Sequence, residues 1–326
     1  MKTEKRSRFR AESRGESFRL TPIDVEVLAL LQRYRYLPSN YIAALLALKG
    51  DYYKDILHKL RHRAGLIDCP PASWAAVNAR YRPAVYCLTD NGAQALKHLS
   101  LYAPRPKTGH EFNHELGVCL IRASFEIGAR EHGLQLITAE DILDHPNCPA
   151  HTRHQKNPWP VPVSFDWTFD GRKTRVEQVV KTDGEFFALA RPHAGGRTTL
   201  AFPGFEFDRR TEPLEPADYE RPSIKKKILA FRAIAGQAIY RSRFGLPNAI
   251  IPFITTNEYH MRSMMKVVEV ISNGHGSKLF IFKSLPNFSA FESFPPPTGH
   301  MLTASWHRVG HPPFDILEEL GIRNQK

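Results

Sequence analysis

The sequence is poor in cysteine and has no long apolar run. Its 326 residues include only four cysteines, Cys69, Cys87, Cys119 and Cys148, without close pairing. Such spacing argues against a disulfide scaffold and favours reduced thiols in a cytoplasmic protein. No stretch approaches the roughly 18 apolar residues of a membrane-spanning helix, so we expect no membrane partner. The first residues are basic and lack an apolar core, so we expect no secretory leader.

Common catalytic fingerprints are also missing from the sequence. We find no dinucleotide-binding glycine pattern, no Ser-His-Asp arrangement and no phosphate loop with its Lys-Ser or Lys-Thr pair. The composition, 42% hydrophobic and 24% charged, is typical of a folded globular protein. At this length, about two domains are expected.

Positive charge is concentrated in the first third of the chain. The whole sequence has 45 Lys and Arg against 33 Asp and Glu, a formal charge of +12, and residues 1–107 hold 19 of the basic and 9 of the acidic residues. This asymmetry is typical of a nucleic-acid partner or another anionic partner. The alternative is a solvated basic face that serves solubility. Residues 1–19 are polar and basic, and we expect a flexible arm there.

Residues 20–100 have the pattern of a winged helix-turn-helix. Apolar residues recur at helical spacing in three successive segments, and Thr21 followed by Pro22 predicts the start of the first. An extended segment from Leu66, a loop and a strand over 84–89 then predict the wing. In helix-turn-helix domains the recognition helix enters the major groove. We expect the third helix, over 52–64, to have that role.

The third predicted helix and the wing are basic. We expect its outward positions to include Lys54, His58, Lys59, Arg61, His62 and Arg63. Double-stranded DNA is the predicted partner, with phosphate and base-edge contacts from Lys54, His58, Lys59, Arg61, Arg63, Arg80 and Arg82. The alternatives are a winged helix that binds protein, and a transcription-type regulator without catalysis. Winged-helix proteins often pair on palindromic sites, so a homodimer is left open.

Residues 101–110 are the predicted linker, and residues 111–326 the second domain. The second domain begins with a helical pattern over 111–133. Strand and helix patterns follow it in mixed order, and they predict an α/β (α+β) fold with a mixed sheet. The extended segments are expected at 134–138, 163–169, 174–180, 184–189, 198–207, 249–255 and 278–282, and the later helices at 224–240 and 262–271.

Three carboxylates in the second domain form the candidate chemical site. Asp183 lies beside one predicted strand, and Glu206 and Asp208 lie two positions apart on another. Residues two apart on a strand point to the same face, so these side chains can converge. Three carboxylates suit Mg²⁺ or Mn²⁺, ions that can polarise a phosphodiester and activate water. We therefore take Asp183, Glu206 and Asp208 as candidate catalytic and metal-binding residues.

Several motifs stand in a characteristic order and spacing. They are the predicted winged helix, Asn113–Leu116, Thr182–Gly184, Phe205–Glu212, Lys225–Lys227 and Ile250–Thr255. Together they resemble the replication-relaxation family of plasmid and mobile-element proteins, and the resemblance covers most of residues 20–310. It implies a winged-helix domain joined to a restriction-endonuclease-like domain, a role in replication control or mobilisation, and a relaxase or replication proteins as partners.

The sequence departs from the nuclease pattern of that wider superfamily at two positions. Thr182 stands where a proline usually precedes the aspartate, and Asp208 stands where a lysine usually follows the glutamate. Without a lysine beside the metal, stabilisation of the transition state is weaker. Lys225 or Lys227 could supply one from the next helix, and Lys225 is our candidate catalytic residue.

These departures leave two interpretations of the second domain open. One is a metal-dependent DNA endonuclease. The other is a degenerate nuclease kept as a scaffold, in which the acidic side chains pair with Arg209, Arg210 or the lysines of the next helix.

A second cluster has ligand types that zinc accepts. His145, Cys148, His151 and His154 fall within ten residues. No second cysteine lies close to them, and the segment has the composition of a polar loop. We therefore do not expect zinc there.

Overall fold

A computed structural model describes residues 18–73, 82–102, 111–193, 196–216, 218, 220–285 and 294–322. The fold is mixed α and β, as predicted. The chain divides into two compact units, one of residues 1–127 with 287–298, the other of residues 128–286 with 299–326. The division falls within helix α5 (Phe112–Glu131), whereas most of the predicted linker lies outside the described residues. So do residues 1–17 of the predicted arm.

The first unit contains short helices and a small antiparallel sheet. Its strand β3 pairs with both β1 and β2, which gives the order β1-β3-β2. Along the chain its elements before α5 are α1 (Pro22–Tyr34), β1 (Leu37–Pro38), α2 (Ser39–Leu45), α3 (Tyr52–His62), β2 (Ile67–Asp68), the 3₁₀ turn η1 (Pro71–Ser73), β3 (Val85–Leu88) and α4 (Asp90–His98).

Helix α1 begins where the sequence predicts. The Thr21 side chain accepts from the Asp24 backbone N–H, and the Asp24 carboxylate accepts from the Thr21 N–H at 2.8 Å. This reciprocal capping box satisfies two backbone donors that the helix itself leaves unpaired. Pro22 follows at the first helical position, where its missing N–H costs nothing.

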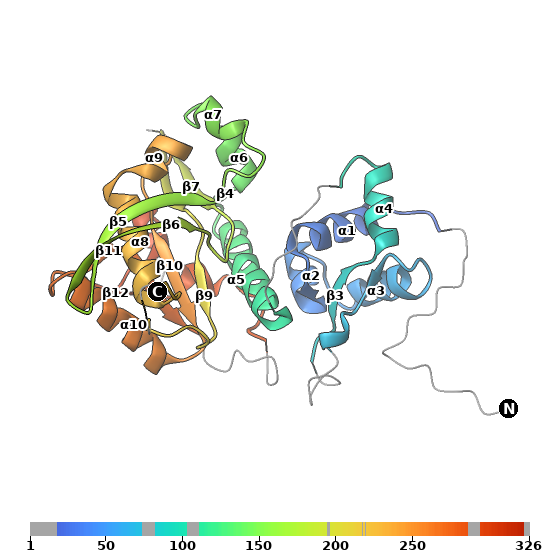
Figure 1. Ribbon diagram of the computed structural model, residues 1–326. Helices are drawn as coiled ribbons and strands as arrows, with labels where there is room; N and C mark the ends of the chain where they lie inside the picture. The colour runs from blue at the N-terminus through green and yellow to red at the C-terminus, as the bar shows by residue number, and fades with distance from the viewer. Residues whose placement is uncertain are drawn as a thin grey trace. The chain divides into compact units, whose positions relative to one another are not determined.

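Among the described residues of the second unit, the strands form three sheets, and Figure 1 draws these strands as arrows. Strands β9 (Glu206–Asp208), β10 (Ile251–Thr255) and β11 (Ser277–Ser284) are parallel, and β12 (His307–Val309) pairs antiparallel with β11. An antiparallel sheet has the order β4 (Gln135–Ile137), β7 (Phe187–His193), β8 (Gly196–Phe202). The third is the hairpin of β5 (Val161–Phe169) and β6 (Arg172–Val180), and its turn is formed by Asp170 and Gly171, a dipeptide typical of such turns.

Helices connect and cover these strands. Between β9 and β11 the chain runs through α8 (Ile224–Gly236) and α9 (Ile239–Phe244) before β10, and through α10 (Glu258–Ile271) after it. Because right-handed crossovers join successive parallel strands, α8 and α10 cover the same face of the sheet. Phe231 of α8 packs edge-on against Phe253 of β10. The remaining helices are α6 (Ala139–Asp144), α7 (Ala150–Arg153), α11 (His300–Thr303) and α12 (Ile316–Glu319).

The predicted strand over 198–207 is wrong as a single element. Strand β8 ends at Phe202, and β9 starts at Glu206 in another sheet. Between them Pro203 has no N–H to donate to a ladder, and Gly204 has a φ of 82°, which favours glycine. The predicted helix over 224–240 also breaks, at Gln237, and Ala238 takes a left-handed conformation before α9.

In the described part of the chain, no helix combines the length and apolarity needed to cross a membrane.

Candidate functional site

Two of the three predicted carboxylates lie on strand β9, and the third contacts the backbone of that strand. Glu206 and Asp208 lie two positions apart on β9, and both are buried. Asp208 is in register with Thr255, the last residue of β10. The carboxyl ends of parallel strands are where open α/β sheets bind ligands, so the location suits a functional site.

Asp183 reaches this site through a tight turn. Its carboxylate accepts from the Phe207 backbone N–H at 2.8 Å, and the Gly184 N–H donates to the Phe205 carbonyl at 3.0 Å. A Cβ at position 184 would lie 2.1 Å from the Phe205 ring. The glycine therefore allows the turn to approach β9, so that Asp183 contacts the backbone between Glu206 and Asp208.

Glu206 is the most deeply buried acid of the site, with 2% of its surface exposed. Its Oε2 accepts from Lys227 Nζ at 2.7 Å, whereas its Oε1 has no hydrogen-bond partner among the described residues. Burial raises the pKa of Glu206 to about 8, against the lowering effect of Lys227, and Asp183 and Glu212 raise it further. The Glu206 carboxylate is therefore protonated more readily than an exposed glutamate.

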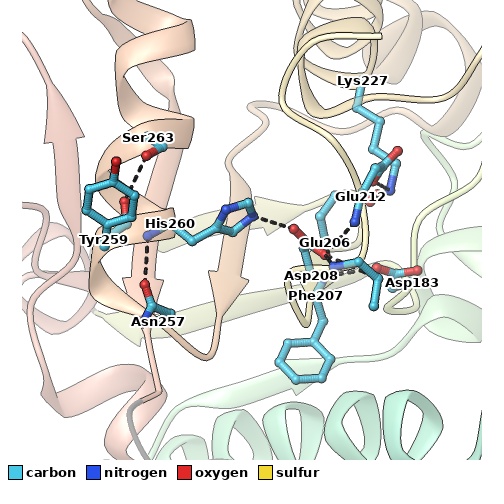
Figure 2. Close-up of polar contacts among 11 residues, drawn as sticks. Asp183, Glu206, Phe207, Asp208, Glu212, Lys227, Asn257, Tyr259, His260 and Ser263 are labelled. Atoms are coloured by element: carbon cyan, nitrogen blue, oxygen red, sulfur yellow. Dashed lines mark hydrogen bonds and ion pairs between the residues drawn. The ribbon is translucent and has the colours of Figure 1, made fainter. Parts of the chain in front are cut away.

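Lys227, which lies on helix α8, contacts two carboxylates (Figure 2). Its Nζ lies 2.7 Å from Oε2 of Glu206 and 2.7 Å from Oε2 of Glu212. Burial lowers the pKa of Lys227, but the negative charges of Glu206, Asp183 and Glu212 outweigh burial and raise the pKa above its ordinary value. The lysine therefore keeps its positive charge beside the acids.

Asp208 contacts a histidine that the sequence analysis did not identify. His260 Nε2 lies 2.6 Å from Asp208 Oδ2, and Figure 2 shows the ring reaching from α10 toward β9. The other oxygen, Oδ1, accepts from the backbone N–H groups of Thr211 and Glu212. Both carboxylate oxygens of Asp208 are thus engaged within the protein.

A local signal in the sequence indicates where His260 lies. Asn257 follows β10 and caps α10, and its side chain accepts from the His260 N–H at 2.9 Å. We expected this helix to begin at Arg262, which left His260 in a loop. An asparagine just after a buried strand indicates an earlier start, which would have put His260 in the first turn at the carboxyl edge of the sheet.

Lys225, the predicted catalytic lysine, pairs with an acid other than Glu206, Asp208 or Asp183. Its Nζ forms an ion pair with Glu215 at 2.9 Å, and Lys227, two positions later, contacts Glu206 instead. Glu206 therefore pairs with a lysine of the next helix, one of the arrangements considered from the sequence. Asp208 pairs with His260 rather than with Arg209 or Arg210.

The His and Cys residues of the second cluster lie around α7. Cys148 is buried, and burial raises the pKa of its thiol. The His145 ring accepts from the Asn147 N–H, and His151 and His154 are exposed. Over the ranges that the structure describes, no group of three His, Cys, Asp or Glu is arranged to hold a metal ion, here or at the carboxylate site.

The donor chemistry at β9 still fits a hard cation. Glu206 Oε1 and Thr255 Oγ1 are buried oxygen atoms without hydrogen-bond partners in the described structure. Oxygen donors of this kind are what Mg²⁺ and Mn²⁺ prefer. Asp208 fits less well because both of its oxygens already accept hydrogen bonds or contact His260.

On α3, three of the predicted DNA-binding residues are exposed. They are Lys54, His58 and Arg63. Arg82, beside the wing strand, is half-buried and lies over the Phe294 ring, whereas Arg80 lies outside the described residues.

The other two basic residues of α3 are engaged with acids. Lys59 is half-buried and forms an ion pair with the buried Asp24 at 3.2 Å. Arg61 is buried, and its Nε donates to Asp68 at 2.9 Å. The prediction that Arg61 faces outward is therefore wrong: its position on α3 turns it toward β2, where Asp68 compensates its charge.

Comparison with protein-family models, with curated proteins and with solved structures finds no match to this chain.

Proposed function

We propose that the chain is a DNA-binding protein of a plasmid or mobile element that acts in replication control or mobilisation, as its resemblance to the replication-relaxation family implies. The observation that carries the proposal is the order of elements in the first unit, from α1 through β1, α2 and α3 to β2 and β3, with the sheet order β1-β3-β2. This order of elements supports a winged helix. In this proposal the second unit is a restriction-endonuclease-like domain.

The exposed side of α3 supports DNA as the partner. Lys54, His58 and Arg63 face solvent there, and Tyr52 at the start of the helix is 58% exposed. Basic side chains on a recognition helix neutralise phosphates, and a major groove admits one helix. Lys59 and Arg61 contribute less because their side chains are largely buried in their pairs with Asp24 and Asp68, whereas the pair of Lys54 with Asp51 is exposed.

Salt-dependent binding of duplex DNA tests this proposal. Lys54→Ala and Arg63→Ala should each weaken binding and reduce the slope of log K against log salt by about 0.9, the value for one lost phosphate contact. Lys97→Ala is the charge-matched control, since Lys97 is exposed on α4. Equal slopes for all three variants would contradict a DNA contact through α3.

A second candidate function, metal-dependent DNA cleavage, is favoured by one observation. Lys227 lies against Glu206, whose Oε1 is buried without a partner in the described structure. Asp183 and Glu206, with Asp208, would hold Mg²⁺ or Mn²⁺, which when bound would polarise a phosphodiester and activate water. Lys227 would place a fixed positive charge where the phosphate develops negative charge. It would thus replace the lysine missing at position 208.

The same contacts also allow a site without catalysis. The Lys227 ammonium is already shared by Glu206 and Glu212, so the acids can be balanced without a metal. The protein would then be a DNA-binding scaffold or a winged-helix regulator.

Plasmid nicking separates these possibilities. Supercoiled plasmid is incubated with Mg²⁺ or Mn²⁺ and the wild type, Glu206→Gln, Lys227→Met or Lys225→Met. Metal-dependent nicking that disappears in the first two variants and persists in Lys225→Met supports the endonuclease. Absence of nicking by the wild type refutes it and leaves DNA binding as the function.

A further inference from the structure

The contact between Asp208 and His260 joins two elements that are far apart in the chain. Asp208 ends β9, and His260 lies in the first turn of α10. Both side chains are largely buried, with 6% and 14% exposed, and the contact measures 2.6 Å. The Asn257 side chain also accepts from the His260 backbone N–H, so the cap of α10 holds the backbone from which the ring extends.

The second oxygen of Asp208 organises the turn that follows β9. Oδ1 accepts from the Thr211 N–H at 3.0 Å and from the Glu212 N–H at 3.4 Å. Arg210 within this turn has a φ of 68°, a conformation that a side chain disfavours. The turn therefore depends on hydrogen bonds for its shape, and these come from the carboxylate that His260 contacts.

This turn places Glu212 at the candidate site. Glu212 Oε2 lies 2.7 Å from Lys227 Nζ, and the same Nζ contacts Glu206. A continuous set of contacts thus runs from His260 through Asp208 and the turn to Glu212 and Lys227 (Figure 2). These contacts link His260 of α10 to Lys227 of α8.

We propose that His260 is a positioning residue of this site. By holding Asp208, it fixes the turn over 208–212 and so sets Glu212 against Lys227. Asp208 then serves to orient the site from within the protein. The consequence for cleavage rests on the proposed function, whereas the structural role does not depend on it.

Backbone amide exchange measures the proposed role directly. The experiment compares full-length wild type with His260→Ala and His260→Gln at the amides of Thr211 and Glu212. The Phe207 amide is the internal reference, because it donates to Asp183 and not to Asp208. Ser263→Ala is the matched control, since the Ser263 hydroxyl bonds only to the Tyr259 carbonyl of its own helix among the contacts described.

We expect His260→Ala to speed exchange at Thr211 and Glu212 about tenfold, the effect of weakening a hydrogen bond to a charged group. The Phe207 amide should keep its rate. His260→Gln should restore slow exchange because its amide N–H can still donate to Asp208. Unchanged exchange in His260→Ala would overturn the proposal, as would an equal increase at all three amides or in Ser263→Ala.

The nicking assay examines the consequence for catalysis separately. If the wild type cleaves plasmid, His260→Ala should lower kcat and leave KM for DNA unchanged, and His260→Gln should recover most of kcat. An unaltered kcat in His260→Ala would contradict the consequence for catalysis. If the wild type does not cleave, the endonuclease proposal fails while the amide result still decides the role of His260.

Discussion

Lys227 and Glu206 form an ion pair at 2.7 Å between helix α8 and strand β9, and Glu206 is almost fully buried. The lysine side chain is about one third exposed, so water reaches one side of the pair. The glutamate therefore bears most of the cost of leaving water. This imbalance gives the stability of the second unit a definite dependence on pH.

Stability should fall as pH rises from about 5 to 8. The folded-state pKa of Glu206 is raised from 4.5 to about 8. The folded protein thus binds a proton that the unfolded chain releases, and this stabilisation is lost as pH passes through the folded value. Urea unfolding in metal-free buffer should show that the wild type loses at least about 1.4 kcal/mol more than Glu206→Gln over this range. Parallel pH profiles for the two proteins would argue against the raised pKa.

Lys59 should matter more for stability than for DNA binding. It neutralises Asp24, which is fully buried, so Lys59→Met leaves an uncompensated carboxylate. We expect a loss of about 1–3 kcal/mol, below the roughly 3–5 kcal/mol of fully buried pairs because Lys59 is partly exposed. Guanidinium unfolding measures it. Lys54→Met breaks an exposed pair with Asp51 and should leave the free energy of unfolding close to that of the wild type. A larger loss of stability in Lys54→Met than in Lys59→Met would contradict this prediction.

Variants of Arg61 and Arg63 should distinguish a loss of stability from a loss of DNA binding. Arg61→Ala removes a buried side chain that pairs with Asp68, and should cost about 2 kcal/mol or more of unfolding free energy. Arg63→Ala, at an exposed position, should cost little stability and weaken DNA binding. Both variants should be assayed at a temperature where they are folded. Stronger loss of DNA affinity in Arg61→Ala than in Arg63→Ala would show that Arg61 reaches DNA.

Gly184 should tolerate no side chain. A Cβ there would lie within 2.6 Å of three atoms of the Phe205 ring, which is packed in the interior. Gly184→Ala should therefore cost about 1–3 kcal/mol by overpacking and displace Asp183. Gly236→Ala is the control, since nothing lies within 4 Å and alanine favours the helix. Thermal unfolding of both variants checks the prediction, and equal melting temperatures would contradict it.

Local signals predicted much of the fold. The Thr21 cap, the Asp170–Gly171 turn and the shared face of Glu206 and Asp208 follow from rules that involve only a few neighbouring residues. Asp183 lies beside another predicted strand, and its contact with the Phe207 backbone is a feature of the structure. The winged helix and the nuclease-like domain remain predictions.

Other features depend on partners distant in sequence. Basic residues at successive positions of α3 look alike in the sequence, and only the position of Asp68 on β2 decides that Arg61 turns inward. Likewise, three successive lysines follow Ile224 at the start of α8. The position of the helix on the sheet decides that Lys227, and not Lys225, contacts Glu206. His260 lies 52 positions from Asp208, so no local pattern connects them.

The site at the end of β9 is assembled from segments spread over a long stretch of chain. Asp183 comes from a turn before β9, Lys227 from α8 and His260 from α10. During synthesis the acids leave the ribosome well before the histidine. A nascent chain that stops short of α10 therefore contains the carboxylates without their positioning contact. The completed site is consequently a marker that folding of the second unit has reached α10, and any activity it has should arise only after that helix docks.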